Sequence, residues 1–123
     1  MNSVVISIGS NCEDCNLHIA NSIKFLDEHL NGCSFSEVYR TSALNGKDAD
    51  YLNAVVSGYA DCEFETLSKM LKSYESANGR TPECKLMGSV PIDLDIVIWN
   101  DEVLRPRDYK CDFFQIGWKQ IVK

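Results

Sequence analysis

The order of the hydrophobic periodicities along the chain is the feature that most constrains its fold. Residues 3–8, 33–40, 51–60 and 92–99 are β-branched or alternate between apolar and polar positions, as strands do. Residues 13–30 and 63–79 instead repeat apolar positions at helical spacing, and they stop near Gly32 and Gly79. Asp61 is a candidate N-cap for the second helix. Residues 41–50 and 80–91 are irregular and predict loops.

This β-α-β-β-α-β order predicts an α+β protein of the ferredoxin-like class, a four-stranded antiparallel sheet with both helices on one face. The 123 residues contain no internal repeat and no linker, so we expect one domain over residues 1–123. A ligand would then bind on the open face of the sheet. The aromatic tail after Asn100 is expected to add a short strand or to pack over that face.

Composition limits the partners of the chain. Twelve Lys and Arg face eighteen Asp and Glu, a net charge of −6, which argues against duplex nucleic acid and anionic membranes. A small anionic ligand remains compatible, because a local cation cluster or a metal can hold a phosphate. The N-terminus lacks the pattern of a signal peptide, so we expect a cytoplasmic protein whose six cysteines are free thiols. The sequence leaves the oligomeric state open.

Asp93 and Asp95 are the most informative pair of polar residues. On a strand they share one face with Val97 and Trp99, while Ile92, Leu94, Ile96 and Ile98 take the other face. Two adjacent carboxylates repel each other, and a hard cation such as Mg²⁺ between them would remove that repulsion. The alternative is a solvated sheet face on which Lys or Arg side chains pair with the two acids.

Four segments together resemble one known family. They are Ile8–Asn11 (IGSN), Tyr39–Leu44 (YRTSAL), Asp50–Val55 (DYLNAV) and Ile92–Trp99 (IDLDIVIW). In this order and at these separations they are similar to the 6-hydroxymethyl-7,8-dihydropterin pyrophosphokinases of folate biosynthesis, over about residues 3–109. The resemblance implies the same fold and the transfer of a pyrophosphoryl group from ATP to the pterin hydroxymethyl group, with two Mg²⁺ ions.

The resemblance also implies roles for individual residues. Asp93 and Asp95 match the metal-binding acids. The residues that match the pterin side are Thr41, Ser42, Leu44, Tyr51 and Asn53, with Phe113 or Phe114 as the ring-stacking aromatic. Those that match the nucleotide side are Glu75 and Arg80. Ordinary structural roles stay open for three of these residues: Tyr51 in the core, Asn53 at a turn or edge, and Arg80 as a cap of the second helix.

The chain departs from the family in its cations. The stretch from Arg80 to Ile92 keeps only Arg80 and Lys85 as cations, with Met87 at a tryptophan position, and Arg107 stands where the family has histidine. The replacement cations that we consider for the ATP phosphates are Arg80, Lys85, Arg105, Arg107 and Lys110, with Arg107 as the first choice for catalysis. The resemblance also indicates a short, divergent member that lacks the family's C-terminal portion.

Three functions therefore remain. The first is an active pyrophosphokinase with ATP and a pterin as substrates. The second is a non-catalytic module that binds a pterin or a protein partner. The third is an adaptor without a ligand, which would leave the pairing of Asp93 and Asp95 unexplained.

Overall fold

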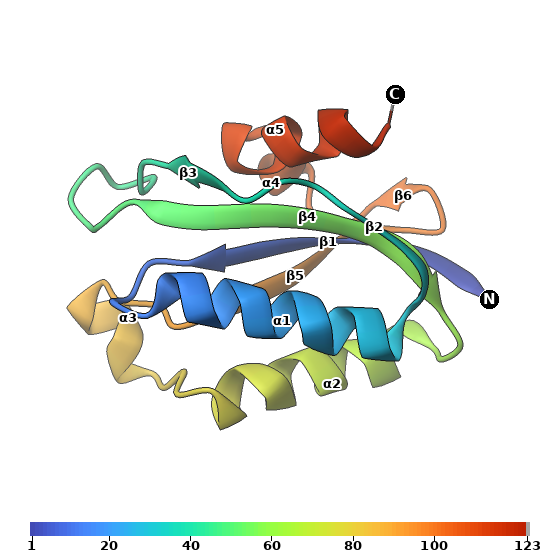
Figure 1. Cartoon of the computed structure of the whole chain (residues 1–123), viewed down its shortest axis with the longest axis horizontal. Helices are drawn as coiled ribbons and strands as arrows, with labels where there is room; N and C mark the ends of the chain where they lie inside the picture. Colours follow the sequence, from blue (N-terminus) through green and yellow to red (C-terminus); the bar gives the residue numbers. More distant parts are fainter. Residues whose placement is uncertain (123) are drawn as a thin grey trace.

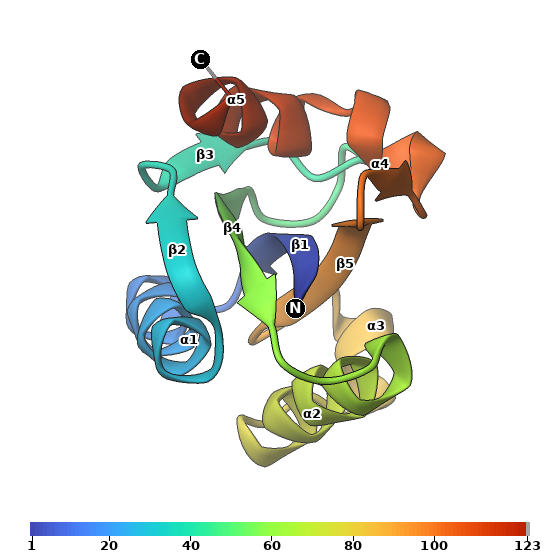
Figure 2. The same ribbon diagram turned by 90° about the vertical axis from the view of Figure 1, so that its right-hand side faces the viewer.

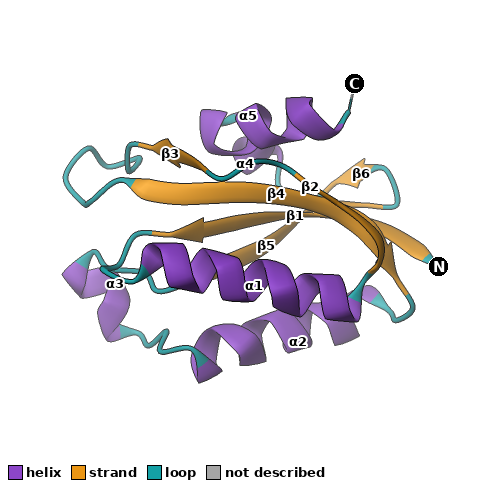
Figure 3. Cartoon of the chain, in the orientation of Figure 1, coloured by secondary structure: helices purple, strands orange, loops and turns teal. Residues whose placement is uncertain are grey.

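A computed structural model gives the structure of residues 1–122, except for the side chain of Lys85. Figures 1 and 3 show the strands and helices of the chain. The elements are β1 (Asn2–Ser10), α1 (Cys15–His29), β2 (Asn31–Phe35), β3 (Tyr39–Thr41), β4 (Tyr51–Ala60), α2 (Phe64–Ala77), α3 (Glu83–Met87), β5 (Asp93–Trp99), β6 (Glu102–Val103), α4 (Pro106–Lys110) and α5 (Asp112–Ile121).

One antiparallel sheet organises the molecule. Its strand order is β2-β4-β1-β5-β6, and the short β3 also pairs with β4. Helices α1 and α2 cover one face (Figures 1 and 2), so the predicted α+β class, an antiparallel sheet with both helices on one face, is confirmed. The predicted number of four strands is wrong: the described residues form six strands, because the strand expected over residues 33–40 is divided into β2 and β3 and the tail adds β6. The core between helices and sheet consists of the apolar residues that set the two periodicities, among them Ile6, Ile19, Val56, Leu67 and Leu94.

The C-terminal tail covers part of the opposite face of the sheet, as expected. Helices α4 and α5 lie over this face in Figure 2. Phe114 is fully buried there in a second cluster with Val5, Val55, Val97 and Ile98. Among the described residues, no helix combines the length and the apolar character needed to cross a bilayer.

A bulge in β5 makes the predicted faces of Ile98 and Trp99 wrong. Ile96 lies opposite Ile6 and Ile98 lies opposite Val5, so Val97 is an extra residue in the ladder. The extra residue reverses the alternation. Ile98 therefore packs in the cluster below α5, and Trp99 turns to the helical face, where its ring meets Phe64 edge-on at 5.4 Å.

The expected strand over residues 33–40 is also interrupted. Between β2 and β3, the Ser36 N–H donates to the Val55 carbonyl (2.9 Å), and the Ser36 hydroxyl accepts from the Val55 N–H (2.8 Å). Cys33 and Phe35 pack against the helical core, whereas Tyr39 points to α5 and donates to the Phe113 carbonyl. The alternation expected for one strand over residues 33–40 therefore does not hold through Tyr39.

Two boundary predictions also need correction. Helix α2 begins after Glu63 without a side-chain cap, and Asp61 instead accepts a hydrogen bond from Asn31 Nδ2 at 3.2 Å. Within the stretch 80–91, which we expected to be irregular, residues Glu83–Met87 form the short helix α3.

Replacing Gly117 with alanine tests the packing of α5 on the sheet. Alanine stabilises an average helix by about 1 kcal/mol relative to glycine. Here, however, a Cβ would lie 2.6 Å from Val55 Cγ2 and 2.8 Å from the Tyr39 hydroxyl oxygen. We therefore expect Gly117→Ala to lower the free energy of unfolding by about 1–3 kcal/mol in urea denaturation. Ile116→Ala, on the exposed side of α5, is the control, and a Gly117→Ala protein as stable as the original would contradict this packing.

Candidate functional site

A cavity of about 330 Å³ opens on the sheet face opposite α1 and α2. Three central strands form its floor, and the loop after β3 and the C-terminal tail form its walls. The floor residues are Ser7, Gly9, Tyr51, Asn53, Asp93 and Asp95; the loop contributes Thr41, Ser42, Ala43, Leu44, Asn45 and Asp48, and the tail contributes Arg105, Asp108 and Phe113.

Most of the residues predicted from the sequence for metal and pterin binding line this one cavity. They are Asp93, Asp95, Thr41, Ser42, Leu44, Tyr51, Asn53 and Phe113, joined by Arg105 from the predicted cations. Phe114 is fully buried, so Phe113 is the aromatic residue available to a ligand. The structure brings these side chains together; their individual roles stay predictions.

Asp93 and Asp95 face the same cavity, as the alternation of β5 predicts. They lie opposite Gly9 and Ser7 of β1, two small residues that leave room above the carboxylates. Burial, together with repulsion from Asp93, raises the pKa of Asp95 to about 7, although Arg105 acts in the opposite direction. A cation placed between the two acids would therefore relieve an existing repulsion.

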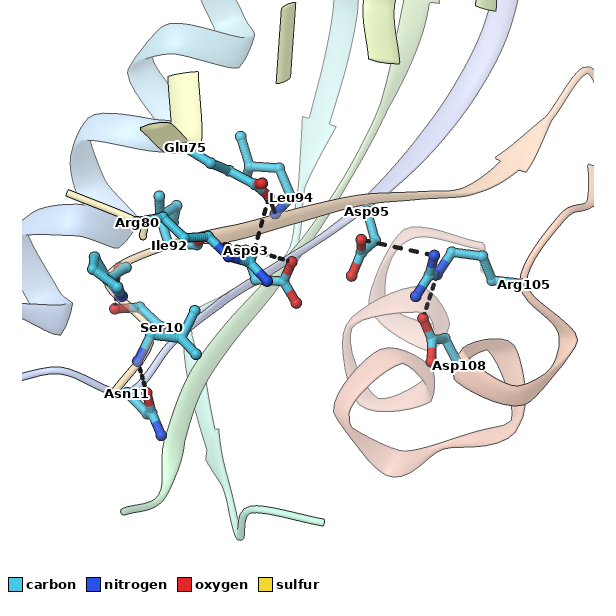
Figure 4. Close-up of polar contacts among 12 residues, drawn as sticks. Ser10, Asn11, Glu75, Arg80, Ile92, Asp93, Leu94, Asp95, Arg105 and Asp108 are labelled. Atoms are coloured by element: carbon cyan, nitrogen blue, oxygen red, sulfur yellow. Dashed lines mark hydrogen bonds and ion pairs between the residues drawn. The ribbon is translucent and has the colours of Figure 1, made fainter. Parts of the chain in front are cut away.

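Two arginines approach the acid pair from opposite sides (Figure 4). Arg80 Nη1 lies 2.7 Å from Asp93 Oδ1, and Arg105 Nη1 lies 3.9 Å from Asp95 Oδ1. Asp108 accepts a hydrogen bond from Arg105 Nε and so holds this arginine beside the cavity. The ion-pair alternative from the sequence is thus realised in the structure, and the metal site stays a prediction.

The chemistry of the donor set fits Mg²⁺. Mg²⁺ is commonly held by one or two carboxylates together with waters and substrate phosphates. Asp93 and Asp95 provide the carboxylates, and the described part of the chain holds no cluster of three or more His, Cys, Asp or Glu placed to bind a metal. The remaining ligands would therefore come from water and from the phosphates of a nucleotide.

Asn53 organises the other end of the cavity. Its side chain is 2% exposed, and Nδ2 donates to Thr41 Oγ1 at 2.8 Å, with longer contacts to the carbonyls of Tyr39 and Tyr51. These contacts fix the plane of the amide beside the loop that begins at Thr41. The amide is thus held in a fixed orientation at the cavity floor, and its role toward a ligand stays a prediction.

Tyr51 lines the cavity and is not simply a core residue. It packs over Gly9, where a Cβ would lie 3.5 Å from Tyr51 Cδ2. Burial and then the negative charges of Asp93 and Asp48 raise the pKa of its hydroxyl. The Tyr51 hydroxyl is therefore a neutral hydrogen-bonding group at neutral pH.

Glu75 and Arg80 lie beside the cavity and do not line it. Glu75 is buried at the end of α2, accepts from the Leu94 N–H at 2.8 Å and pairs with Arg80 at 3.2 Å. Burial raises the pKa of Glu75, opposed by the Leu94 hydrogen bond and by Arg80. Arg80 also donates to the Ile92 carbonyl, so it ties α2 to the start of β5. Their nucleotide role stays a prediction.

Two other predicted cations, Arg107 and Lys110, do not lie at the cavity. Arg107 and Lys110 are exposed on α4 and are not among the lining residues of the cavity. The side chain of Lys85 lies outside the described residues. The catalytic role of Arg107 stays a prediction from the resemblance, whereas Arg105 is the tail arginine that reaches the acid pair.

Several lining residues were not expected from the sequence, namely Ser7, Gly9, Ala43, Asn45, Asp48 and Asp108. Ser7 and Gly9 did carry a signal, because they are the small residues that alternate with Ile6 and Ile8. Their place in the site depends on the pairing of β1 with β5, which the periodicity of one strand does not determine.

Comparison with known proteins connects this geometry to a family. The model of the 7,8-dihydro-6-hydroxymethylpterin-pyrophosphokinase (HPPK) family matches residues 5–123, and so extends past residue 109 through the C-terminal helices. The 2-amino-4-hydroxy-6-hydroxymethyldihydropteridine pyrophosphokinase of Aquifex aeolicus (strain VF5) is 31% identical over 108 residues, which cover 87% of this chain and 67% of the relative. The folate synthesis bifunctional protein of Chlamydia trachomatis serovar D is 29% identical over 117 residues, covering 89% of this chain and 26% of that protein. The chain belongs to the 7,8-dihydro-6-hydroxymethylpterin-pyrophosphokinase family.

Proposed function

We propose that this protein transfers a pyrophosphoryl group from ATP to the hydroxymethyl group of 6-hydroxymethyl-7,8-dihydropterin in folate biosynthesis. One observation carries the proposal: a single cavity is lined by the Asp93 and Asp95 carboxylates and also by Thr41, Asn53 and Phe113. The name of the Aquifex relative, a pyrophosphokinase, supports the same reaction. All six cysteines are free thiols, which fits the cytoplasm that we propose as its location.

The pterin would occupy the Asn53 end of the cavity. There, the Asn53 amide would meet the polar edge of the ring, and backbone groups from Thr41 to Leu44 would contact it from the loop. Phe113 would pack against the face of the ring. These contacts would direct the hydroxymethyl group toward Asp93 and Asp95.

The nucleotide phosphates would lie at the acid end. Asp93 and Asp95 would hold Mg²⁺, which offsets phosphate charge and orients the groups that react. Arg105 and Arg80, already placed beside the two acids, would stabilise negative charge on the phosphate oxygens. The hydroxymethyl oxygen would form a bond to the β-phosphorus of ATP. The bond between this phosphorus and the AMP oxygen would break, and the hydroxyl proton would be released.

Formation of AMP tests the proposal directly. The protein should convert ATP to AMP only when Mg²⁺ and 6-hydroxymethyl-7,8-dihydropterin are both present, with one pyrophosphorylated pterin formed for each AMP. Absence of AMP from the folded protein with both substrates at saturating concentration would reject the catalytic function.

A non-catalytic pterin-binding module is the second candidate. The observation that favours it is the charge of the cavity, which is lined by Asp48, Asp93, Asp95 and Asp108 against the single lining cation Arg105 among the described residues. Such a cavity accepts a neutral pterin more readily than a polyphosphate. Pterin binding without formation of AMP would identify this function.

Asn53→Ala should weaken pterin binding whether or not the protein is catalytic. Loss of the amide leaves polar groups of the buried ligand without partners, which weakens binding by about 1–3 kcal/mol. Calorimetry with 6-hydroxymethylpterin in the absence of ATP measures the effect, and Asn21→Ala on the exposed side of α1 is the control. Equal affinities of the two variants would place the pterin elsewhere.

A further inference from the structure

Asn11 lies in the turn between β1 and α1. It is 6% exposed and does not line the cavity. Its side-chain amide is nevertheless fully used: Oδ1 accepts from the Val90 N–H at 2.5 Å, and Nδ2 donates to the carbonyls of Gly88 (2.9 Å) and Ala49 (3.4 Å). One buried side chain thus contacts two loops that are far apart in the sequence.

The first of these loops, residues 88–92, leads directly into Asp93. The Asn11 N–H donates to the Val90 carbonyl at 3.0 Å, so Asn11 and Val90 are joined through both backbone and side chain. The Ser10 hydroxyl donates to the Pro91 carbonyl at 2.6 Å (Figure 4 shows this region). The start of β5 is therefore fastened to the end of β1.

The second loop, residues 42–50, forms the wall of the cavity that contains Asp48. This loop touches the first one at Gly88, whose φ is +67°. A Cβ at Gly88 would lie 2.2 Å from Asp48 Oδ1, so the Asp48 side chain of the second loop packs directly against the Gly88 backbone of the first. Asn11 sits at this junction and hydrogen-bonds to both sides of it.

We propose that Asn11 is a positioning residue that holds two loops at a fixed separation. They are residues 42–50, in the cavity wall, and residues 88–92, which precede Asp93. Asn11 acts through these loops, without contact to the substrates, and its catalytic consequence rests on the function proposed above. If the loops were released, only a fraction of the molecules would present a formed cavity. Apparent pterin affinity would then fall by that fraction.

Hydrogen exchange of the protein without ligands tests the positioning role first. Asn11→Ala should speed amide exchange in both residues 42–50 and residues 88–92, with β4 and β1 still protected. Asn21→Ala, which removes an exposed amide from α1, should change neither loop. Faster exchange confined to one of the two loops would overturn the proposal.

Two glycines provide a second pair of variants, which decides the question if Asn11→Ala fails to fold. Gly88 and Gly46 have nearly the same backbone conformation, with φ of +67° and +69°, but a Cβ at Gly46 meets nothing within 4 Å. Both alanine variants carry the same backbone strain, so their difference reports the contact with Asp48. Gly88→Ala should speed exchange across the junction, in residues 45–49, whereas Gly46→Ala should leave exchange in residues 88–92 unchanged. Unchanged exchange in residues 45–49 of Gly88→Ala would overturn the proposal.

Kinetics separate positioning from a general loss of stability. For Asn11→Ala we expect the KM for the pterin to rise about tenfold while kcat at saturating substrate changes less than about threefold, because substrate binding restores the loops. An unchanged KM with a lowered melting temperature would show a purely structural role and overturn the proposal. If the unmodified protein forms no AMP, the proposed function fails, and the exchange measurements still decide the role of Asn11.

Discussion

An Asp95→Asn variant is expected to form AMP at least about a hundredfold more slowly than the unmodified protein, because loss of the proposed metal ligand would remove several kcal/mol of transition-state stabilisation. Asparagine keeps the shape of the side chain but removes the negative charge that would hold the cation. The proposed pterin-binding residues Thr41, Asn53 and Phe113 are untouched, so pterin affinity without ATP should stay the same. Steady-state AMP formation and calorimetry measure the two quantities.

This variant should also fold normally. Asp95 is repelled by Asp93, and its ion pair with Arg105 is long and partly exposed, so neutralising it removes a repulsion and only a weak attraction. The control is Asp101→Asn in the turn before β6, where φ is +68° and asparagine is well tolerated. Turnover of Asp95→Asn within threefold of the control would contradict the metal-binding role.

The face shared by Asp93 and Asp95 was predictable because it depends only on the alternation within one strand. The same rule failed after the bulge at Val97, because the bulge places Ile98 and Trp99 on the faces opposite to those predicted. A bulge depends on the partner strand, since it is the pairing with Val5 and Ile6 that leaves one residue unmatched. Local periodicity carries no information about that pairing.

Tyr39 shows the same limit on the other side of the sheet. An alternating pattern over residues 33–40 predicted one strand, but hydrogen bonds between Ser36 and Val55 interrupt it, and Tyr39 turns toward Gly117 of α5. Its hydroxyl donates to the Phe113 carbonyl, and burial raises its pKa to about 12. Tyr39 thereby fixes the helix that brings Phe113 to the cavity, a contact between residues 74 positions apart.

The composition of the site was partly predictable for a related reason. Residues carried over from the resemblance, such as Thr41, Asn53 and Asp95, were found in one cavity because the fold places their strands side by side. Asp48 and Asp108 were missed because they reach the cavity from loops and the tail, where neither alternation nor helical spacing predicts direction. The acidity of the cavity is consequently a property of the structure rather than of any motif.

Because the cavity is acidic, binding of the ATP phosphates would depend on the arginines of the tail. The structure favours Arg105 over Arg107 for this role. Arg105 lines the cavity, contacts Asp95 at 3.9 Å and is held by Asp108, whereas Arg107 is exposed on α4. A guanidinium beside the transferred phosphate is commonly worth about 10³-fold or more in rate. We therefore expect most of the tail's electrostatic contribution to come from Arg105.

Arg105→Ala should lower kcat by about a hundredfold or more, while Arg107→Ala should lower it less than about tenfold. Pterin affinity measured without ATP should be the same in both variants, because the pterin is neutral and its proposed position is beside Asn53. Asp108→Asn should fall between them, since it keeps Arg105 but removes the carboxylate charge that helps to orient it. A larger effect of Arg107→Ala would restore the assignment implied by the resemblance, with a rearranged α4 in the loaded enzyme. Equal, small effects of both variants on measurable turnover would show that neither tail arginine stabilises the transferred phosphates, and would leave Arg80, fixed between Glu75 and Asp93, as the cation to replace next.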